Sequence, residues 1–223
     1  MASDLVTLTP AKRGAPDAST GTQRDTIRKA AIRLFNSWGY EATSVKRIAQ
    51  ALNMAPANLY NYYASKEALL FDVMQCQLDQ VLARERRIVE EHQHPAERLR
   101  ALAWDLVMHD LRDPLDAFVG RHDLRGLTGA RRETISEMMA AVRSIWIATI
   151  AQGAAEEVFI GEDPKLAALV SLTTCSSVAS WYVPTGEYTP DQVADHAADS
   201  VVRSLAARPV APVPGRAGGR GAR

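Results

Sequence analysis

The chain has 223 residues, 47% of them hydrophobic, which is enough for one large or two small folded domains and excludes a disordered chain. Its 26 basic and 26 acidic side chains give a net charge of zero, so the chain as a whole is not a polycation. The two cysteines, Cys76 and Cys175, lie far apart in apolar helical patterns, which excludes a disulfide framework and fits a reduced cytoplasm.

The charge is divided unevenly along the chain. Residues 22–70 carry 7 basic and 3 acidic side chains, whereas residues 71–207 carry 13 basic and 21 acidic ones. A small basic module therefore precedes a larger acidic one, and only the first suits a polyanion. The flanking segments 1–21 and 208–223 are rich in Pro, Gly, Ala and Arg, and we expect both to be disordered.

The first predicted helix begins at Thr22, because Asp25 three residues later completes a capping-box pattern, and it ends before Gly39. Apolar residues recur at helical spacing between these ends. A second short helix is capped by Thr43 or Ser44. Asn53 follows it, at a position where helices often end in a left-handed residue.

Pro56 begins a third helix in which Leu59 and Tyr63 are one turn apart and pack inward. Two short helices joined by a tight turn, behind a longer one, form a helix-turn-helix. Amides and phenols on the outer side of the third helix suit base edges and phosphate oxygens: Asn58, Tyr60, Asn61 and Tyr62. Neighbouring tyrosines are otherwise core aromatics, and we keep that alternative for Tyr63. The cations expected to contact phosphate are Arg24, Arg28, Lys46, Arg47 and Lys66.

The run "YEATSVKRIAQALNMAPANLYNYYASKEALL" resembles the N-terminal DNA-binding domain of the TetR family of transcriptional regulators, and the resemblance covers residues 22–70. It implies phosphate contacts by Ser44 and Lys66, base reading by Asn58 and Asn61, and contacts of Tyr60 and Tyr62 with backbone or bases. Family members often have Gly where Asn53 stands, a hydroxyl residue where Ala55 stands, and Gly-Thr where Ala57-Asn58 stands. The operator sequence therefore cannot be carried over from a relative.

The remaining chain predicts further helices and almost no strand, which gives an all-α fold of about nine helices. Thr189 with Gln192 predicts a capping box at the last helix. The predicted helices after the third are Ser65–Glu91, one from Pro95, Pro114–Leu127, Arg131–Gln152, Lys165–Tyr182 and Pro190–Ala206.

The last two predicted helices carry small residues at helical spacing, which let helices approach closely. The resemblance implies that these helices pair across a homodimer, as two operator half-sites require. An intrachain core is the alternative. The residues expected at the interface are Ser171, Cys175, Val178, Ala194, Ala198 and Val202.

Bulky or soft side chains in the central helices suit an apolar effector, although each is otherwise an ordinary core residue. The segments "HDLRGLTGARRETI" and "SWYVPTGEYTPDQVADHAADSVV" are similar to a TetR subgroup associated with lipid and steroid acyl-CoA catabolism. That similarity implies an acyl-CoA thioester as one candidate effector. The expected ligand contacts are Trp104, Met108, Phe118, Arg125, Met139, Trp146 and Trp181, with Arg125 facing an anionic end.

No pattern of residues indicates catalysis. His92 and His94 lack the spacing of a helical zinc motif, and no glycine-rich phosphate loop or activated nucleophile occurs, so we expect no enzyme, cofactor or metal. The uncharged stretch 166–186 holds several Ser and Thr residues, among them Ser171, Thr173 and Thr174, and is interpreted as a buried helix rather than a membrane span. The N-terminus has no apolar segment of signal-peptide length.

The sequence thus predicts a cytoplasmic, ligand-responsive repressor that binds a palindromic operator in double-stranded DNA as a homodimer. Residues 22–70 form the DNA-binding domain, and residues 71–207 bind the effector and dimerise. A small apolar effector releases the repressor from DNA. The alternative is a helical small-molecule carrier with a vestigial DNA-binding head.

Overall fold

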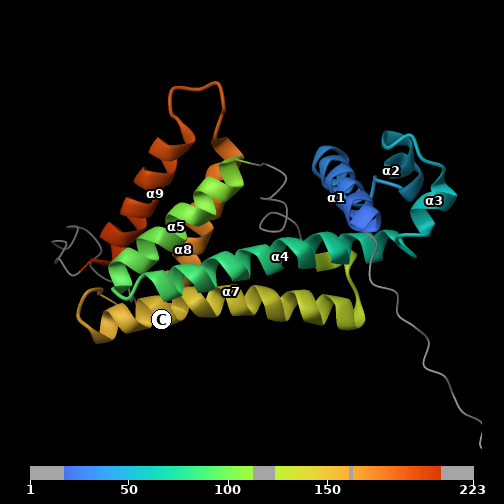
Figure 1. The fold of residues 1–223 in the computed structure, drawn as a ribbon. Coiled ribbons are helices and arrows are strands. Elements are labelled where there is room, and N and C mark those ends of the chain that lie inside the picture. Colours follow the sequence, from blue (N-terminus) through green and yellow to red (C-terminus); the bar gives the residue numbers. More distant parts are fainter. Residues whose placement is uncertain (1–17, 113–123, 161–162, 207–223) are drawn as a thin grey trace, which may run out of the picture. The chain divides into compact units, whose positions relative to one another are not determined.

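The computed structural model of this protein describes residues 18–112, 124–160 and 163–206, with side chains from residue 23 onward (Figure 1). Within these ranges the regular structure is helical, and the predicted all-α class is confirmed. The chain divides into two compact units, Met1–Leu70 and Phe71–Arg223.

The first unit contains α1 (Ala18–Trp38), α2 (Val45–Ala51), α3 (Pro56–Tyr60) and the start of α4 (Lys66–Glu91). Helix α1 begins four residues before the predicted start, so Thr22 lies inside the helix and does not cap it. Gly39 and Asn53 take left-handed backbone conformations, with φ of 79° and 53°. For Asn53 this is the conformation that the sequence predicted.

The core of the first unit is formed by apolar side chains from all four helices. The buried Thr43 hydroxyl donates to the carbonyls of Leu34 (3.2 Å) and Gly39 (2.8 Å), and so fixes the turn between α1 and α2. The buried side chains include Ile27, Ala31, Phe35, Ile48, Leu59, Tyr63 and Leu69. This core leaves the outer side of α3 exposed to solvent.

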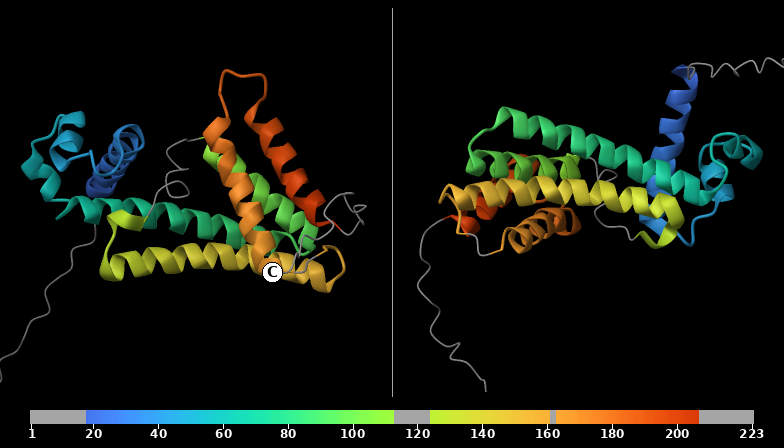
Figure 2. Two further views of the ribbon diagram at one scale, coloured as in Figure 1. Left: turned by 180° about the vertical axis from the view of Figure 1, so that it is seen from behind. Right: turned by 90° about the horizontal axis from the view of Figure 1, so that it is seen from below.

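The second unit contains the rest of α4 with α5 (Pro95–Arg112), a 3-10 helix (Leu124–Gly126), α7 (Gly129–Ala155), α8 (Pro164–Trp181) and α9 (Pro190–Leu205). The described residues therefore form eight α-helices and one 3-10 helix. Most of the predicted helix Pro114–Leu127 lies outside them. Figure 2 shows that the part of α4 beyond residue 70 runs beside α7, and α5 packs against α8 and α9.

Helix ends in the second unit are closed by side chains. The capping box predicted at α9 is present, because Thr189 N–H donates to Gln192 Oε1 and Gln192 N–H donates to Thr189 Oγ1. The buried Arg98 guanidinium donates to the carbonyls of His92 (2.8 Å) and Gln93 (3.2 Å) at the end of α4. These bonds satisfy carbonyls that a helix end leaves without partners.

The structure corrects the predicted dimer residues. Ser171, Cys175 and Val178 of α8 are buried within one chain, as are Ala194 and Ala198 of α9. Val202 is half-buried and packs against the same core. The small side chains do allow close helix packing, and within the chain both helices pack against α5. Burial therefore favours the intrachain alternative for five of the six residues, and a partner contact of the half-buried Val202 stays a prediction.

Candidate DNA-reading surface and effector pocket

Helix α3 presents polar side chains around a buried anchor. Leu59 and Tyr63 are 1% and 4% exposed, as predicted, whereas Asn58, Tyr60 and Asn61 are exposed. The helix ends at Tyr60, but Asn61 keeps right-handed helical backbone angles and continues the same surface. The amides of Asn58 and Asn61 are one turn apart and share a face of α3, and the phenol of Tyr60 is exposed next to Asn61 in the chain.

Tyr62 differs from its prediction because it is half-buried rather than directed to solvent. Its carbonyl accepts a hydrogen bond from Arg24 Nη2 at 3.2 Å, and the Arg24 guanidinium lies 5.1 Å from the centre of the Tyr63 ring. Arg24 thus holds the end of α3 against α1, and this contact fixes the orientation of the exposed residues on α3.

Ser44 caps α2, since its Oγ accepts a hydrogen bond from Arg47 N–H at 3.1 Å. The hydroxyl proton of this exposed serine is still available to donate to a phosphate oxygen. Lys46 is exposed on the first turn of α2, and the Arg47 guanidinium lies 4.6 Å from the centre of the Trp38 ring. The start of α2 therefore gathers a hydroxyl and two cations on one exposed surface.

Lys66 is engaged inside the first unit. Its Nζ donates to the carbonyl of Tyr40 at 2.9 Å and of Glu41 at 3.4 Å, and it lies 3.9 Å from Glu41 Oε2. It also lies 4.0 Å from the centre of the Tyr40 ring. Three oxygen atoms thus surround the ammonium, and Lys66 ties the start of α4 to the turn after α1. The phosphate contact predicted for Lys66 stays a prediction.

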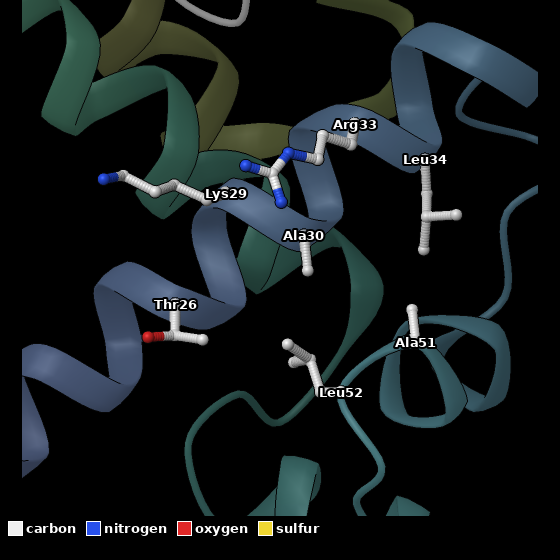
Figure 3. Close-up of a pocket in the computed structure, with 7 residues that line it drawn as sticks. All are labelled: Thr26, Lys29, Ala30, Arg33, Leu34, Ala51 and Leu52. Atoms are coloured by element: carbon white, nitrogen blue, oxygen red, sulfur yellow. The ribbon is translucent and has the colours of Figure 1, made fainter.

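A hollow of about 290 Å³ lies between α1 and α2. Figure 3 shows Thr26, Ala30 and Leu34 of α1 facing Ala51 and Leu52 across it. Its walls are mostly apolar, and the polar side chains at its edge are those of Thr26, Lys29 and Arg33. We interpret it as a packing gap rather than a binding site.

A larger pocket of about 470 Å³ lies in the second unit among α4, α5, α7 and α8. Most of its wall is apolar, and hydroxyls of α8 with a few charged or amide groups supply the polar part. The apolar lining includes Leu78, Val81, Leu106, Met139, Val142 and Leu172. The polar lining is Gln77, Glu85, His109, Asp110, Arg143, Thr173, Ser176, Ser177 and Ser180. A pocket with a mostly apolar wall and polar groups set into it is typical of a small-molecule site.

The predicted ligand residues do not all line this pocket. Met139 lines this pocket, whereas Met108 is buried in the core and Trp104 is half-buried against it. Trp146 is completely buried and reaches the pocket only through its hydrogen bond to Glu85. For these three the ordinary-core alternative holds.

The other predicted ligand residues lie away from the pocket. Trp181 is 57% exposed and lines a separate hollow with Tyr188 and His196. Arg125 is exposed on the 3-10 helix, and Phe118 lies outside the described residues. Among its described members, the predicted ligand set thus contributes Met139 alone to the lining of this pocket.

The sequence analysis missed Glu85, the most unusual residue of the pocket. Its side chain is 3% exposed, and its Oε1 accepts a hydrogen bond from Trp146 Nε1 at 2.9 Å. Burial raises the pKa of Glu85 to about 7, an effect that the Trp146 hydrogen bond opposes. A signal was present, because Glu85 falls on the apolar side of α4 with Leu82 and Ile88.

Helix α8 has an exposed face that the sequence analysis interpreted as buried. We define the α8 outer stripe as the residues three or four apart along this face: Leu166, Val170, Thr174, Ser177 and Trp181. Three of them, Leu166, Val170 and Trp181, are 57% to 59% exposed. Large apolar side chains exposed in a row mark an interaction surface.

The part of the chain that the structure describes shows neither a metal-binding cluster nor a membrane-spanning helix. No group of three His, Cys, Asp or Glu side chains there is arranged to hold a metal ion. No described helix combines the length and apolar character needed to cross a membrane.

Known proteins resemble both units. Residues 27–73 match the family model described as "Bacterial regulatory proteins, tetR family", and residues 92–205 match "Tetracyclin repressor-like, C-terminal domain". The HTH-type transcriptional repressor KstR2 of Rhodococcus jostii is 26% identical over 203 residues, which cover 89% of this chain and 98% of the relative. KstR2 of Mycobacterium tuberculosis is 28% identical over 178 residues, covering 77% and 87%.

Solved structures agree with the fold. The crystal structure of AibR in complex with isovaleryl coenzyme A and operator DNA aligns with a TM-score of 0.74 and 27% identity, over 82% of this chain and 97% of AibR. The structure of the ketosteroid transcriptional regulator KstR2 of M. tuberculosis gives a TM-score of 0.76 and 25% identity, over 83% and 96%.

Proposed function

Because the chain belongs to the TetR family of bacterial regulatory proteins, we propose that it represses transcription from operator DNA until an effector occupies the pocket of its second unit. The observation that carries the proposal is that Asn58, Tyr60 and Asn61 are all exposed on or just after α3, while Leu59 and Tyr63 between and beside them are buried. A carrier protein has no use for such exposed side chains on a basic unit.

In the proposed complex, α3 enters the major groove. Asn58 and Asn61 read base edges, and Tyr60 contacts bases or backbone. Ser44 and Lys46 bind phosphate, with the half-buried Tyr62 at the margin of the contact. Lys66 positions the unit through Tyr40 and Glu41.

We propose that the operator is palindromic and that the protein binds it as a homodimer. The α8 outer stripe replaces the predicted interface residues, because it is the exposed face of the same helix. Its apolar side chains would be covered by the same stripe of a second copy, which gives a two-fold contact.

The effector is proposed to be a small apolar molecule, with an acyl thioester of coenzyme A as the first candidate. The AibR complex supports this class, since a similar fold there holds isovaleryl coenzyme A. Apolar walls of the 470 Å³ pocket suit an acyl group, and the α8 hydroxyls with Arg143 suit its polar remainder. Release from DNA requires the effector to bind the released conformation more tightly.

The relatives are transcriptional regulators, not enzymes, and we propose that this chain also acts without catalysis, in the cytoplasm where its DNA lies. A gel-shift titration tests the proposal, using DNA from upstream of the protein's own gene with random DNA as competitor. We expect a complex that persists in the presence of the competitor DNA and dissociates when isovaleryl coenzyme A is added. Failure to retain either DNA at low salt would favour the carrier alternative.

A further inference from the structure

The carboxyl group of Glu85 has one oxygen in use and one without a partner. Oε1 accepts the Trp146 Nε1 hydrogen bond at 2.9 Å, whereas Oε2 is buried and has no hydrogen-bond partner among the described residues. Glu85 is 3% exposed and lines the pocket. A buried polar atom left unpaired is costly, so a bound molecule that pairs it gains affinity.

The surroundings determine which kind of group can pair with Oε2. The indole N–H of Trp146 occupies Oε1, so in the uncharged acid the proton resides on Oε2 and makes it a donor. Burial favours this uncharged form, since it raises the pKa of Glu85 to about 7.

Charged groups face this end of the pocket from three helices. Arg84 of α4 forms an ion pair with Asp105 of α5 at 2.9 Å, so its charge is largely compensated. His109 and Asp110 of α5 and Arg143 of α7 also line the pocket. Asp110, another buried acid, lines the same pocket. An anionic ligand group would lose its hydration in this mostly apolar pocket and would be repelled by any ionised carboxyl group there.

We propose that Glu85, oriented by Trp146, is the specificity-determining residue of the pocket and selects effectors that place an uncharged hydrogen-bond acceptor against Oε2. A ketone, thioester or ester carbonyl meets this requirement, and a carboxylate does not. The inference rests on the proposed function, because it takes this pocket as the effector site. It adds that the buried end of the effector carries a neutral carbonyl.

Two small probes of equal chain length test the selection: 2-octanone, a neutral acceptor, and octanoate, an anion. Binding is followed at pH 6 by calorimetry on the full-length protein. The wild type should bind 2-octanone about tenfold more tightly than octanoate. Glu85→Leu should lose about tenfold in 2-octanone affinity. Glu85→Gln should keep it, because its amide can accept from Trp146 and donate to the ketone.

Glu90→Leu is the matched control, since Glu90 lies on the same helix and is exposed. It should bind both probes like the wild type. Unchanged affinity of folded Glu85→Leu for 2-octanone would overturn the selection by Glu85 while leaving the pocket as the effector site. If the wild type bound neither probe, the pocket itself would be refuted as an apolar effector site, and the inference with it.

Discussion

The carboxyl group of Glu85 is buried in the lining of a mostly apolar pocket, where it accepts a hydrogen bond from the indole N–H of Trp146. Its pKa in the folded protein, about 7, lies above the ordinary value of 4.5. The folded state therefore holds the proton more tightly than the unfolded state. The contribution of Glu85 to the free energy of unfolding is therefore fully present below about pH 4.5 and is lost as the pH rises through 7.

Glu85→Gln should remove this dependence because the amide does not titrate. Relative to the wild type, its free energy of unfolding should rise by up to about 3 kcal/mol between pH 4.5 and pH 8. Urea unfolding at several pH values measures the difference. The control Glu90→Gln, at an exposed position, should show the same dependence of the free energy of unfolding on pH as the wild type. If Glu85→Gln also ran parallel to the wild type, Glu85 would not be the cause of that dependence.

Lys46 and Lys66 should behave differently although both were predicted to contact phosphate. Lys66→Met removes two hydrogen bonds to the carbonyls of Tyr40 and Glu41 and should lower the stability of the first unit by about 1 to 3 kcal/mol. Lys46→Met should leave the melting temperature unchanged but weaken binding to all DNA and reduce its salt dependence. Thermal unfolding with anisotropy titrations in two salt concentrations separates them, and the reverse assignment of effects would refute these roles.

Local patterns explain which residues could be predicted from sequence. The cap of Ser44, the left-handed turn at Asn53 and the inward face of Tyr63 each depend on a few neighbours in the chain. The anchoring of Lys66 depends on carbonyls 25 and 26 residues away, and the bond between Glu85 and Trp146 spans 61 residues. No local spacing contains those contacts.

At the scale of the element, α3 should carry sequence preference. Asn61→Ala removes an exposed amide without touching the buried anchor, so it should lower affinity for the operator by about 1 to 3 kcal/mol while leaving affinity for random DNA nearly unchanged. Anisotropy titrations with both DNAs measure the ratio. Equal losses on the two DNAs would contradict a base-reading role.

Helix α8 should carry the dimer contact. Val170→Glu places a charge in the α8 outer stripe, where Val170 is 57% exposed, and should convert the homodimer to a monomer at micromolar concentration. Ala83→Glu, on an exposed position of α4, is the matched control and should remain dimeric. Sedimentation velocity distinguishes the two, and a dimeric Val170→Glu would show that the partner binds elsewhere.

The α8 correction has a plain physical origin. A helix of small and apolar residues has two faces that can pack, and helical spacing groups the residues of each face without saying which neighbour covers it. Helix α8 packs against α5 and α7, Ser171, Cys175 and Val178 are buried, and burial raises the pKa of the Cys175 thiol to about 12. The sequence alone does not tell which face of α8 is exposed. The structure does, because one face packs inside the chain and the opposite face is left in solvent.

At the scale of the molecule, the division of charge follows the division into units. The basic residues 22–70 form the first unit with the exposed side chains of α3, and the acidic second unit holds the pocket. Helix α4 contributes residues to both, from Lys66 in the first to Glu85 in the second.

The most direct test of a ligand-responsive repressor is an anisotropy titration of labelled DNA from upstream of its own gene, with excess random DNA present. Saturable binding that survives the competitor, and that isovaleryl coenzyme A reverses, is the predicted result. Binding to both DNAs with equal affinity, unaffected by the thioester, would contradict both the operator-reading surface and the effector pocket.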